Sequence, residues 1–428
     1  MRVQIEKIVY PGRRLARSGG RTYFTDEGLP GETVEIEPGL EHKTYIEAKT
    51  TAVIHRSADR LDPRCGHYLA CSSLQTLTYP RQLEAKAAQL SEILAPVFGG
   101  EARTIEVAPS PAVWRYRNRL RLSLVRVEGG RFVPAYHLPQ ERDKFVPVED
   151  CHLASETANR LVRDVADLTA ELRGTKLREV EVRESRATGD ILLSLHWSSQ
   201  PASADVDPIL TRVIPRYPAA GVASFFRDKG AFRERPEWGQ PTIQEKVGQT
   251  TYEVGPSAFF QVNVAILPAV LSAMKEAGGL TGGETVADVY GGLGTFGLAL
   301  AEEAGKVLIV ESDPANIRLL GENVARNKAR NVTVSEGTSG EWMPWVLDRS
   351  PEVVILDPPR KGLDPEVVAA LGARPAGKIL YLSCNPTTLA RDLAALALPG
   401  PYDLASVRGF DFFPHTPHIE ALAVLAKR

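Results

Sequence analysis

From about residue 280 to the C-terminus, short apolar runs alternate with amphipathic helical patterns, and this alternation constrains the fold most strongly. The apolar runs are TVADVY, KVLIVE, NVTVSEG, EVVILD and KILYLSC. Such alternation is typical of a mostly parallel sheet that is covered by helices on both faces. We therefore predict an α/β fold with a doubly wound, Rossmann-like sheet in residues 241–428, whose ligands bind beyond the carboxyl ends of the strands.

Polar residues that can carry chemistry lie at the ends of these predicted strands. They are Asp288, Glu311, Asp357 and Cys384. Cys384 is one of four cysteines in 428 residues, and an Asn-Pro pair follows it at once. A structural thiol would more naturally lie inside the apolar run. A reactive thiol is expected where the strand stops and the backbone turns toward a cleft.

The first of these strands runs into a glycine-rich turn, DVYGGLGTFG. Gly292, Gly294 and Gly297 form a G-x-G-x-x-G pattern, and Glu311 follows at the end of the next strand. An acid at that place can bind ribose hydroxyls, so the pattern fits a dinucleotide. The same geometry accommodates S-adenosylmethionine. The glycines alone leave both cofactors open, together with a purely structural turn.

The later strand ends separate these alternatives. Hydride transfer has no use for a cysteine nucleophile, whereas methyl transfer to C5 of uracil needs one, because a thiolate must add to C6 before C5 can attack. A base must then remove the C5 proton. The candidates are Cys384 for the thiolate, Glu420 in the apolar tail for the base, and Asp357 for the pyrimidine edge or the donor.

Three other functions agree with part of the sequence. A nicotinamide-dependent oxidoreductase explains Glu311 but leaves Cys384 without a role. A non-catalytic RNA-binding protein would be favoured by the loss of Cys384 or Glu420, and both are present. An amino-group methyltransferase typically continues its Asp-Pro-Pro turn with an aromatic residue, whereas Arg360 follows here.

The rest of the chain has a different character. Residues 1–55 consist of short β-prone runs separated by glycine and proline, which predicts a small β-barrel. Residues 56–240 are mostly strand-like, with helices predicted within 80–100 and 155–172. We therefore expect three domains, 1–55, 56–240 and 241–428.

The net charge of −2, from 51 basic and 53 acidic residues, does not by itself indicate a nucleic-acid partner. Locally, WRYRNRLRLSLVR places Arg115, Arg117, Arg119 and Arg121 at period two, on one face of a predicted strand. A guanidinium row backed by apolar residues suits RNA phosphates, and a solvated strand face is the alternative. No apolar run approaches a membrane span and no secretory signal is apparent, which favours the cytoplasm. No obligate protein partner is evident.

Three motifs, DPPRKGL, LSCNP and FFPHTPHIE, follow the glycine turn in that order. Together they closely resemble the uracil-C5 RNA methyltransferases, which form 5-methyluridine, and LPGETVEIE in the N-terminal unit resembles a TRAM domain. The resemblance implies S-adenosylmethionine as donor and RNA as substrate, with ribosomal RNA favoured over transfer RNA. It implies Cys384 as nucleophile and Glu420 as base. It also implies donor contacts from Gln261, Tyr290, Gly292, Gly294, Glu311 and Asp357.

The chain departs from this family at two sites. Many members bind a 4Fe–4S cluster through four cysteines, which correspond here to Cys65, Cys71, Leu74 and Cys151. Leu74 cannot ligate, and four thiolates are the usual holding set. The sequence leaves open three remnant cysteines or a substitute ligand such as His67. At the donor site, Thr338 and Thr295 stand where the family pattern differs, so donor affinity is expected to depend more on Glu311 and Gln261.

Overall fold

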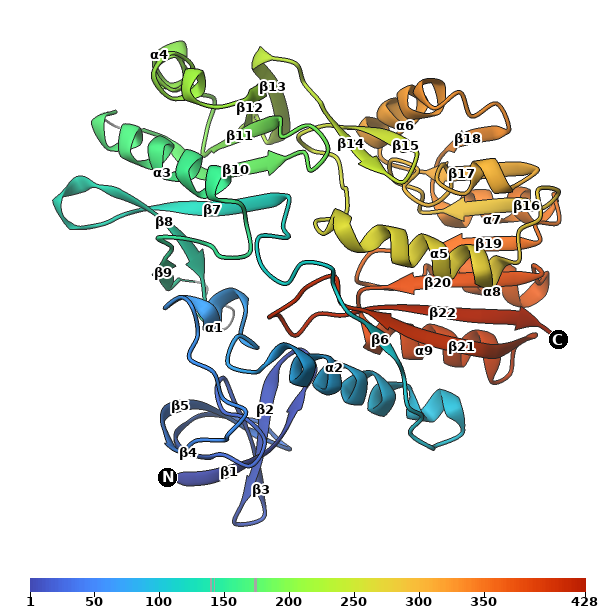
Figure 1. Cartoon of the computed structure of the whole chain (residues 1–428), viewed down its shortest axis with the longest axis horizontal. Coiled ribbons are helices and arrows are strands. Elements are labelled where there is room, and N and C mark those ends of the chain that lie inside the picture. The colour runs from blue at the N-terminus through green and yellow to red at the C-terminus, as the bar shows by residue number, and fades with distance from the viewer. Residues whose placement is uncertain (139–140, 142, 173–174) are drawn as a thin grey trace.

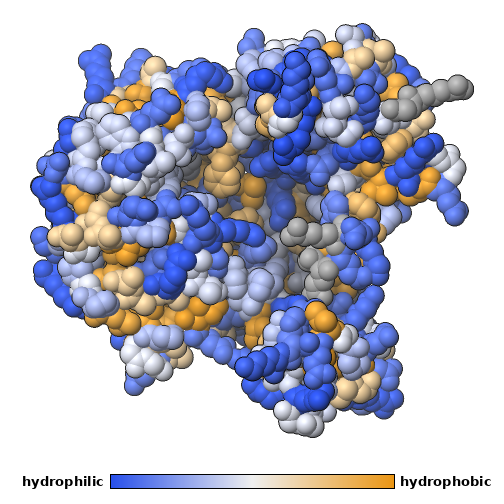
Figure 2. Space-filling model, turned by 180° about the vertical axis from the view of Figure 1, so that it is seen from behind, coloured by the Kyte–Doolittle hydropathy of each residue, from blue (hydrophilic) through white to orange (hydrophobic). Residues whose placement is uncertain are grey.

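The computed structural model describes residues 1–138, 141, 143–172 and 175–428. Its main elements are a closed N-terminal barrel, a seven-stranded central sheet and an eight-stranded C-terminal sheet (Figure 1). This confirms the predicted α/β fold with a barrel at the N-terminus and a mostly β central part. In the space-filling view from behind, the surface is hollowed near its centre, and hydrophobic and hydrophilic side chains both line the hollow (Figure 2).

The C-terminal sheet has the strand order β18-β17-β16-β19-β20-β22-β21-β6. Neighbouring strands from β18 to β20 are parallel, and β22 is antiparallel to both β20 and β21. The strand bounds are β16 (Thr285–Val289), β17 (Lys306–Glu311), β18 (Val332–Glu336), β19 (Val353–Leu356), β20 (Lys378–Ser383), β21 (Tyr402–Phe410) and β22 (Glu420–Lys427).

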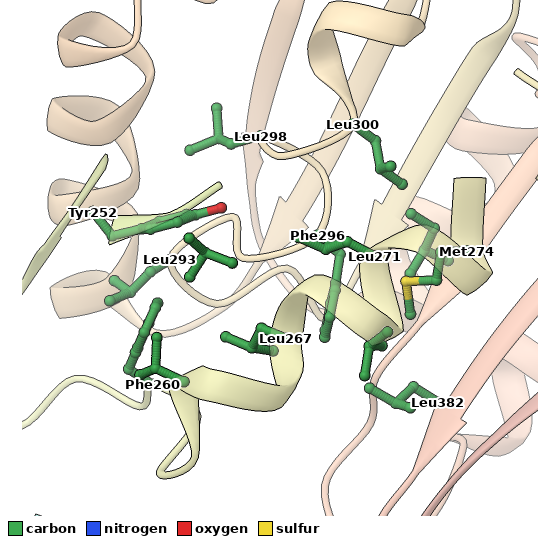
Figure 3. Packing of buried hydrophobic residues seen from close by; sticks show 14 of the residues in the cluster. Tyr252, Phe260, Leu267, Leu271, Met274, Leu293, Phe296, Leu298, Leu300 and Leu382 are labelled. Carbon is green, nitrogen blue, oxygen red and sulfur yellow. The ribbon is translucent and has the colours of Figure 1, made fainter. Parts of the chain in front are cut away.

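Helices cover both faces of this sheet because alternate strand residues point to opposite sides. On one face, Ile309 and Ile355 pack against α5 (Leu267–Gly278) and α6 (Pro314–Arg326). On the other face, α7 (Ser339–Leu347), α8 (Pro365–Ala373) and α9 (Pro386–Ala397) pack on the intervening residues. Figure 3 shows the first face, where Leu271 and Met274 of α5 lie with Phe296 and Leu382.

Residues from the middle of the chain also join the C-terminal sheet. The helix predicted within 80–100 is α2 (Tyr79–Leu94), which packs with α9, and β6 (Val107–Ala108) pairs in parallel with β21. A fully buried ion pair joins Lys86 Nζ of α2 to Asp411 Oδ1 at 2.5 Å. The domain limits at 55/56 and 240/241 therefore stay predictions, since this stretch lies against the sheet of the C-terminal part.

The barrel has the strand order β1-β2-β3-β5-β4 and closes through pairing of β4 with β1. Its interior is filled by alternate apolar residues such as Ile5, Val34 and Ile36. The strands are β1 (Arg2–Val9), β2 (Arg13–Ser18), β3 (Arg21–Thr25), β4 (Thr33–Glu41) and β5 (Ile46–His55).

The central sheet has the order β13-β12-β11-β10-β7-β8-β9, and α3 (Glu156–Glu171) packs on one of its faces. Its strands are β7 (Arg119–Arg126), β8 (Phe132–His137), β9 (Phe145–Pro147), β10 (Leu177–Glu184), β11 (Ile191–Trp197), β12 (Ala219–Asp228) and β13 (Ala231–Gly239). Short helices α1 (Tyr68–Cys71) and α4 (Ser203–Pro208) flank it, and a hairpin of β14 (Ile243–Val247) and β15 (Thr250–Val254) precedes α5.

The alternation of strands and helices predicted after residue 280 has one exception in the described residues, directly after the first strand. The stretch FGLALAEEAG after the glycine turn forms a series of turns that ends in the short 3₁₀ helix η6 (Ala301–Glu303). The glycines at 291–297 weaken helix formation. In addition, the N–H of Gly297 is bonded to the Asp288 carboxylate at 2.8 Å, so it is held outside a regular helical ladder. None of the described helices is long and apolar enough to span a membrane.

Candidate active site

A cavity of about 650 Å³ opens beyond the carboxyl ends of the parallel strands. Its volume lies within the usual range of small-molecule sites. The cavity brings together most of the residues singled out from the sequence. They are Gln261, Tyr290, Gly292, Glu311, Asp357, Cys384 and Glu420. Gly294 does not line it. A Cβ there would lie 2.8 Å from Leu298 and Leu320, so Gly294 permits close packing of the turn.

Cys384 lies between the last residue of β20 and the start of α9, where the backbone turns. The Asn385 side chain caps α9 by accepting from the N–H of Thr387 at 3.2 Å, and Pro386 opens the helix. Burial raises the pKa of the half-buried Cys384 thiol to about 11, the Glu420 charge adds to this effect, and Arg360 opposes it. At neutral pH the free protein therefore holds Cys384 mainly as a thiol.

Glu420 is the first residue of β22 and is only 4% exposed. Among the described residues, its Oε2 has no hydrogen-bond partner. Burial raises its pKa well above the usual value, the Asp357 carboxylate adds to this, and Arg360 again opposes it. An unpaired carboxyl of this kind that faces a cavity is suited to exchange a proton with a ligand.

Arg360 is the cation that acts on both Cys384 and Glu420. It lines the cavity and its guanidinium forms no ion pair with a described residue. In the sequence, Arg360 only distinguishes the DPPR motif from the Asp-Pro-Pro turn of amino-group methyltransferases, and its electrostatic role is not visible there. In the structure, Arg360 favours the anionic forms of both Cys384 and Glu420.

On the side of the cavity predicted to bind the donor, Glu311 fixes the glycine turn. Its Oε2 accepts from the N–H of Gly292 at 2.7 Å, and its Oε1 accepts from the N–H groups of Ser312 and Asp313 at 2.8 and 2.7 Å. Gly292 has φ +56°, and a Cβ there would meet no atom within 4 Å. The turn is thus held open next to the cavity by a carboxylate at the end of β17.

Two further predicted residues complete the cavity wall. Gln261 donates through Nε2 to Asp357 Oδ2 at 3.4 Å. Burial raises the pKa of Asp357 to about 7, and the nearby Asp288 carboxylate adds to this. The Tyr290 hydroxyl donates to Asp364 Oδ2 at 3.1 Å. Asp357 thus accepts from Gln261, and its charge acts on Glu420. This position agrees with either of its two predicted roles, at the pyrimidine edge or at the donor.

The two threonines at departures from the family pattern have structural contacts. Thr338 lines the cavity and caps α7, accepting from the N–H of Glu341 at 3.4 Å while its hydroxyl donates to Glu341 Oε2 at 2.8 Å. The Thr295 carbonyl accepts from the hydroxyl of Tyr252 at 2.9 Å. Thr338 therefore lines the cavity from the N-terminus of α7.

Comparison with known proteins decides the family. Residues 346–428 match the family model described as tRNA (Uracil-5-)-methyltransferase. The chain is 30% identical to an uncharacterised RNA methyltransferase of Halalkalibacterium halodurans, over 99% of this chain and 96% of that one. The chain belongs to the uracil-5 RNA methyltransferases.

A second relative and a solved structure support this. An uncharacterised RNA methyltransferase of Synechocystis is 29% identical over 98% of this chain and 94% of its own. The crystal structure of Pyrococcus abyssi tRNA (uracil-54, C5)-methyltransferase with S-adenosyl-L-homocysteine superposes with a TM-score of 0.77 and 25% identity, covering 100% and 99% of the two chains. The protein is an S-adenosylmethionine-dependent enzyme that methylates uracil C5 in RNA, which removes the oxidoreductase and non-catalytic alternatives.

The arginine row of this methyltransferase differs from its prediction. The prediction that one strand runs through all four arginines is wrong. Strand β7 begins only at Arg119, and Arg115 has a left-handed backbone with φ 54°. The N–H groups of Arg115 and Arg117 bond to the loop carbonyls of His152 and Leu153, at 2.9 Å each, and not to a sheet neighbour.

Acidic residues also face these arginines. Arg115 pairs with Asp150 at 2.7 Å, Arg119 with Glu181 at 2.6 Å, and Arg121 with Glu179. Sequence periodicity could not identify these partners, since they come from β10 and a distant loop. A role of the row in RNA binding stays a prediction, and RNA phosphates would have to compete with these carboxylates.

The cysteines of the methyltransferase do not provide a cluster site. Among the described residues, no group of three or more His, Cys, Asp or Glu side chains is arranged to hold a metal. Cys65 accepts from Gln75 Nε2 at 3.3 Å and Cys151 lies 3.4 Å from the Tyr136 hydroxyl. Leu74 at the third ligand position is fully buried. The residues present therefore do not fit a 4Fe–4S cluster, and no step of the chemistry is assigned to one.

The raised pKa of Cys384 predicts its reactivity. Alkylation by iodoacetamide should accelerate about tenfold per pH unit from pH 7 to 10, because the thiolate is the reactive form and pH remains below a pKa of about 11. Peptide mass spectrometry measures the rate. Cys71 is the internal control, since burial raises its pKa to about 12 and it should react more slowly at each pH. A Cys384 rate that is flat with pH would contradict this.

Proposed function

We propose that this enzyme methylates C5 of a specific uridine in structured RNA, most favourably 23S ribosomal RNA, through a covalent bond between Cys384 and uracil C6. The observation that carries the proposal is that Cys384 and Glu420 line the same cavity as the donor-side residues Gln261, Glu311 and Asp357. S-adenosylmethionine, when bound, supplies an electrophilic methyl group on a sulfonium.

The first step is addition of the Cys384 thiolate to C6. A C–S bond forms, and the electrons of the C5=C6 double bond move to the O4 enolate. Formation of the thiolate is favoured by Arg360, which lowers the pKa of Cys384 against burial. The enolate carbon C5 then takes the methyl group, forming a C–C bond while the C–S bond of the sulfonium breaks and S-adenosylhomocysteine is released.

The second half of the reaction restores the aromatic base. The Glu420 carboxylate removes the proton from C5, the electrons return to the C5=C6 bond, and the C6–S bond breaks to release the Cys384 thiolate. The unpaired Glu420 Oε2 inside the protein supports this role, because no described group competes for it. Its anionic form is favoured by Arg360.

Ribosomal RNA is proposed because the N-terminal barrel resembles a TRAM domain, which suits a large folded RNA. Transfer RNA is the second candidate, and two observations favour it. The family model and the Pyrococcus abyssi structure are both described as transfer RNA enzymes. In both cases the target uridine would be turned out of its loop into the cavity.

The substrate class is tested with two transcripts. Unmodified 23S ribosomal RNA and a transfer RNA mixture are incubated with the enzyme and methyl-labelled donor, and the nucleosides are then separated after digestion. We expect 5-methyluridine in the ribosomal transcript. Methylation of transfer RNA alone would favour the second candidate, and a label on any nucleoside other than 5-methyluridine would contradict the proposal.

A further inference from the structure

The N-terminal barrel reaches the catalytic part of the chain through its β1–β2 turn, residues 10–12. Gly12 in this turn has φ +96°, and a Cβ there would lie 2.7 Å from Cβ of Pro417. Pro417 belongs to the loop between β21 and β22, just before Glu420. In Figure 1 the barrel lies beside α2 and below this C-terminal loop. The turn is thus in direct contact with the segment that delivers the proposed base.

Hydrogen bonds fix the turn in this place. The guanidinium of Arg14, only 1% exposed, donates to the carbonyls of Gly12 and Ser73, the latter at 2.7 Å. The next residue, Leu74, donates its N–H to the His415 carbonyl at 2.9 Å. The barrel turn, the segment after α1 and the loop before β22 are therefore joined by hydrogen bonds from Arg14 and Leu74.

Tyr10 is the first residue of this turn and is half-buried. Burial raises the pKa of its hydroxyl. After burial, the next largest effects on this pKa come from Arg360, which lowers it, and from Cys384 and Glu420, which raise it. These are the groups around which the proposed chemistry takes place. Tyr10 also lies two residues before Gly12, which packs on Pro417 in the loop that leads to Glu420.

We infer that Tyr10 is a positioning residue for the RNA substrate, placing its ring against the target uridine or the nucleotide beside it at the mouth of the cavity. This rests on the proposed function. Aromatic rings stack on unpaired bases in most recognition of single-stranded RNA, and stacking tolerates any base. The barrel would thus take part in seating the reactive nucleotide, in addition to holding RNA at a distance.

Two substitutions test the inference. Tyr10→Ala should raise KM for RNA about tenfold or more, the usual effect of removing one stacked aromatic. Tyr10→Phe should stay near the wild-type value because it keeps the ring. Affinity for S-adenosylhomocysteine should be unchanged in both variants. The matched control is Tyr45→Ala, which removes a barrel tyrosine that stacks on His42 at 4.3 Å.

A second measurement uses the wild-type enzyme, so its result does not depend on whether the Tyr10→Ala variant folds. RNA carrying 5-bromouridine at the target site is irradiated with the enzyme, and crosslinked peptides are identified. We expect a crosslink in the tryptic peptide of residues 8–13, which contains Tyr10. Wild-type KM for RNA in Tyr10→Ala, or absence of this crosslink, would overturn the inference. If the wild-type enzyme forms no 5-methyluridine, the proposed function fails instead, which separates the two.

Discussion

Replacing Glu420 by glutamine should lower turnover by about a thousandfold and leave methylated RNA covalently attached to the enzyme. Glutamine has nearly the same shape and cannot accept the C5 proton. Addition of Cys384 and methyl transfer precede that step, so they should still occur. The product should be visible as a slow band on a denaturing gel that carries both the RNA and the labelled methyl group.

The glutamine variant should fold normally, since burial already favours the uncharged form of Glu420 and no described group bonds its Oε2. Glu336→Gln is a matched control, because Glu336 also lies at a strand end of the same sheet but does not line the cavity. It should keep full activity and form no stable band. Turnover near the wild-type rate in Glu420→Gln would assign the base to another residue.

The second large effect is expected at Cys384. Cys384→Ala should lower methylation by about 10⁴-fold or more, as loss of a catalytic nucleophile does in other enzymes. Without the thiolate, C5 of uracil does not become nucleophilic. Binding of S-adenosylhomocysteine should be unchanged, because the contacts predicted for the donor come from the glycine turn and Glu311, not from Cys384. Activity within tenfold of wild type would contradict nucleophilic catalysis at this residue.

Much of the fold could be predicted because it rests on local patterns. The alternation of apolar strands and helices after residue 280 identified the doubly wound sheet, since each strand is buried on both faces. Parallel strands bring their carboxyl ends to one edge, which is why Glu311, Asp357 and Cys384 could be expected together. Glu420 stood out as an acid in an apolar stretch, and the family motifs gave it a role.

Other features depend on contacts between distant segments and left no local signal. The period-two arginines predicted one strand. In the structure, pairing with β10 begins only at Arg119, and Arg115 forms an ion pair with Asp150 of a loop. The buried pair of Lys86 and Asp411 joins α2 to the segment after β21, more than 300 residues away in the chain. The approach of the β1–β2 turn to the loop before Glu420 follows from the packing of Gly12 on Pro417, far apart in the chain.

The most direct test of the account uses RNA transcripts that contain 5-fluorouridine. Fluorine cannot leave as a proton, so an enzyme that attacks C6 and methylates C5 remains bonded to the RNA. The account predicts a denaturation-resistant adduct in the presence of S-adenosylmethionine, formed by wild-type and Cys65→Ala enzymes and absent in Cys384→Ala. If no adduct forms although native transcripts gain methyl groups, the reaction does not proceed through Cys384 and the account is wrong.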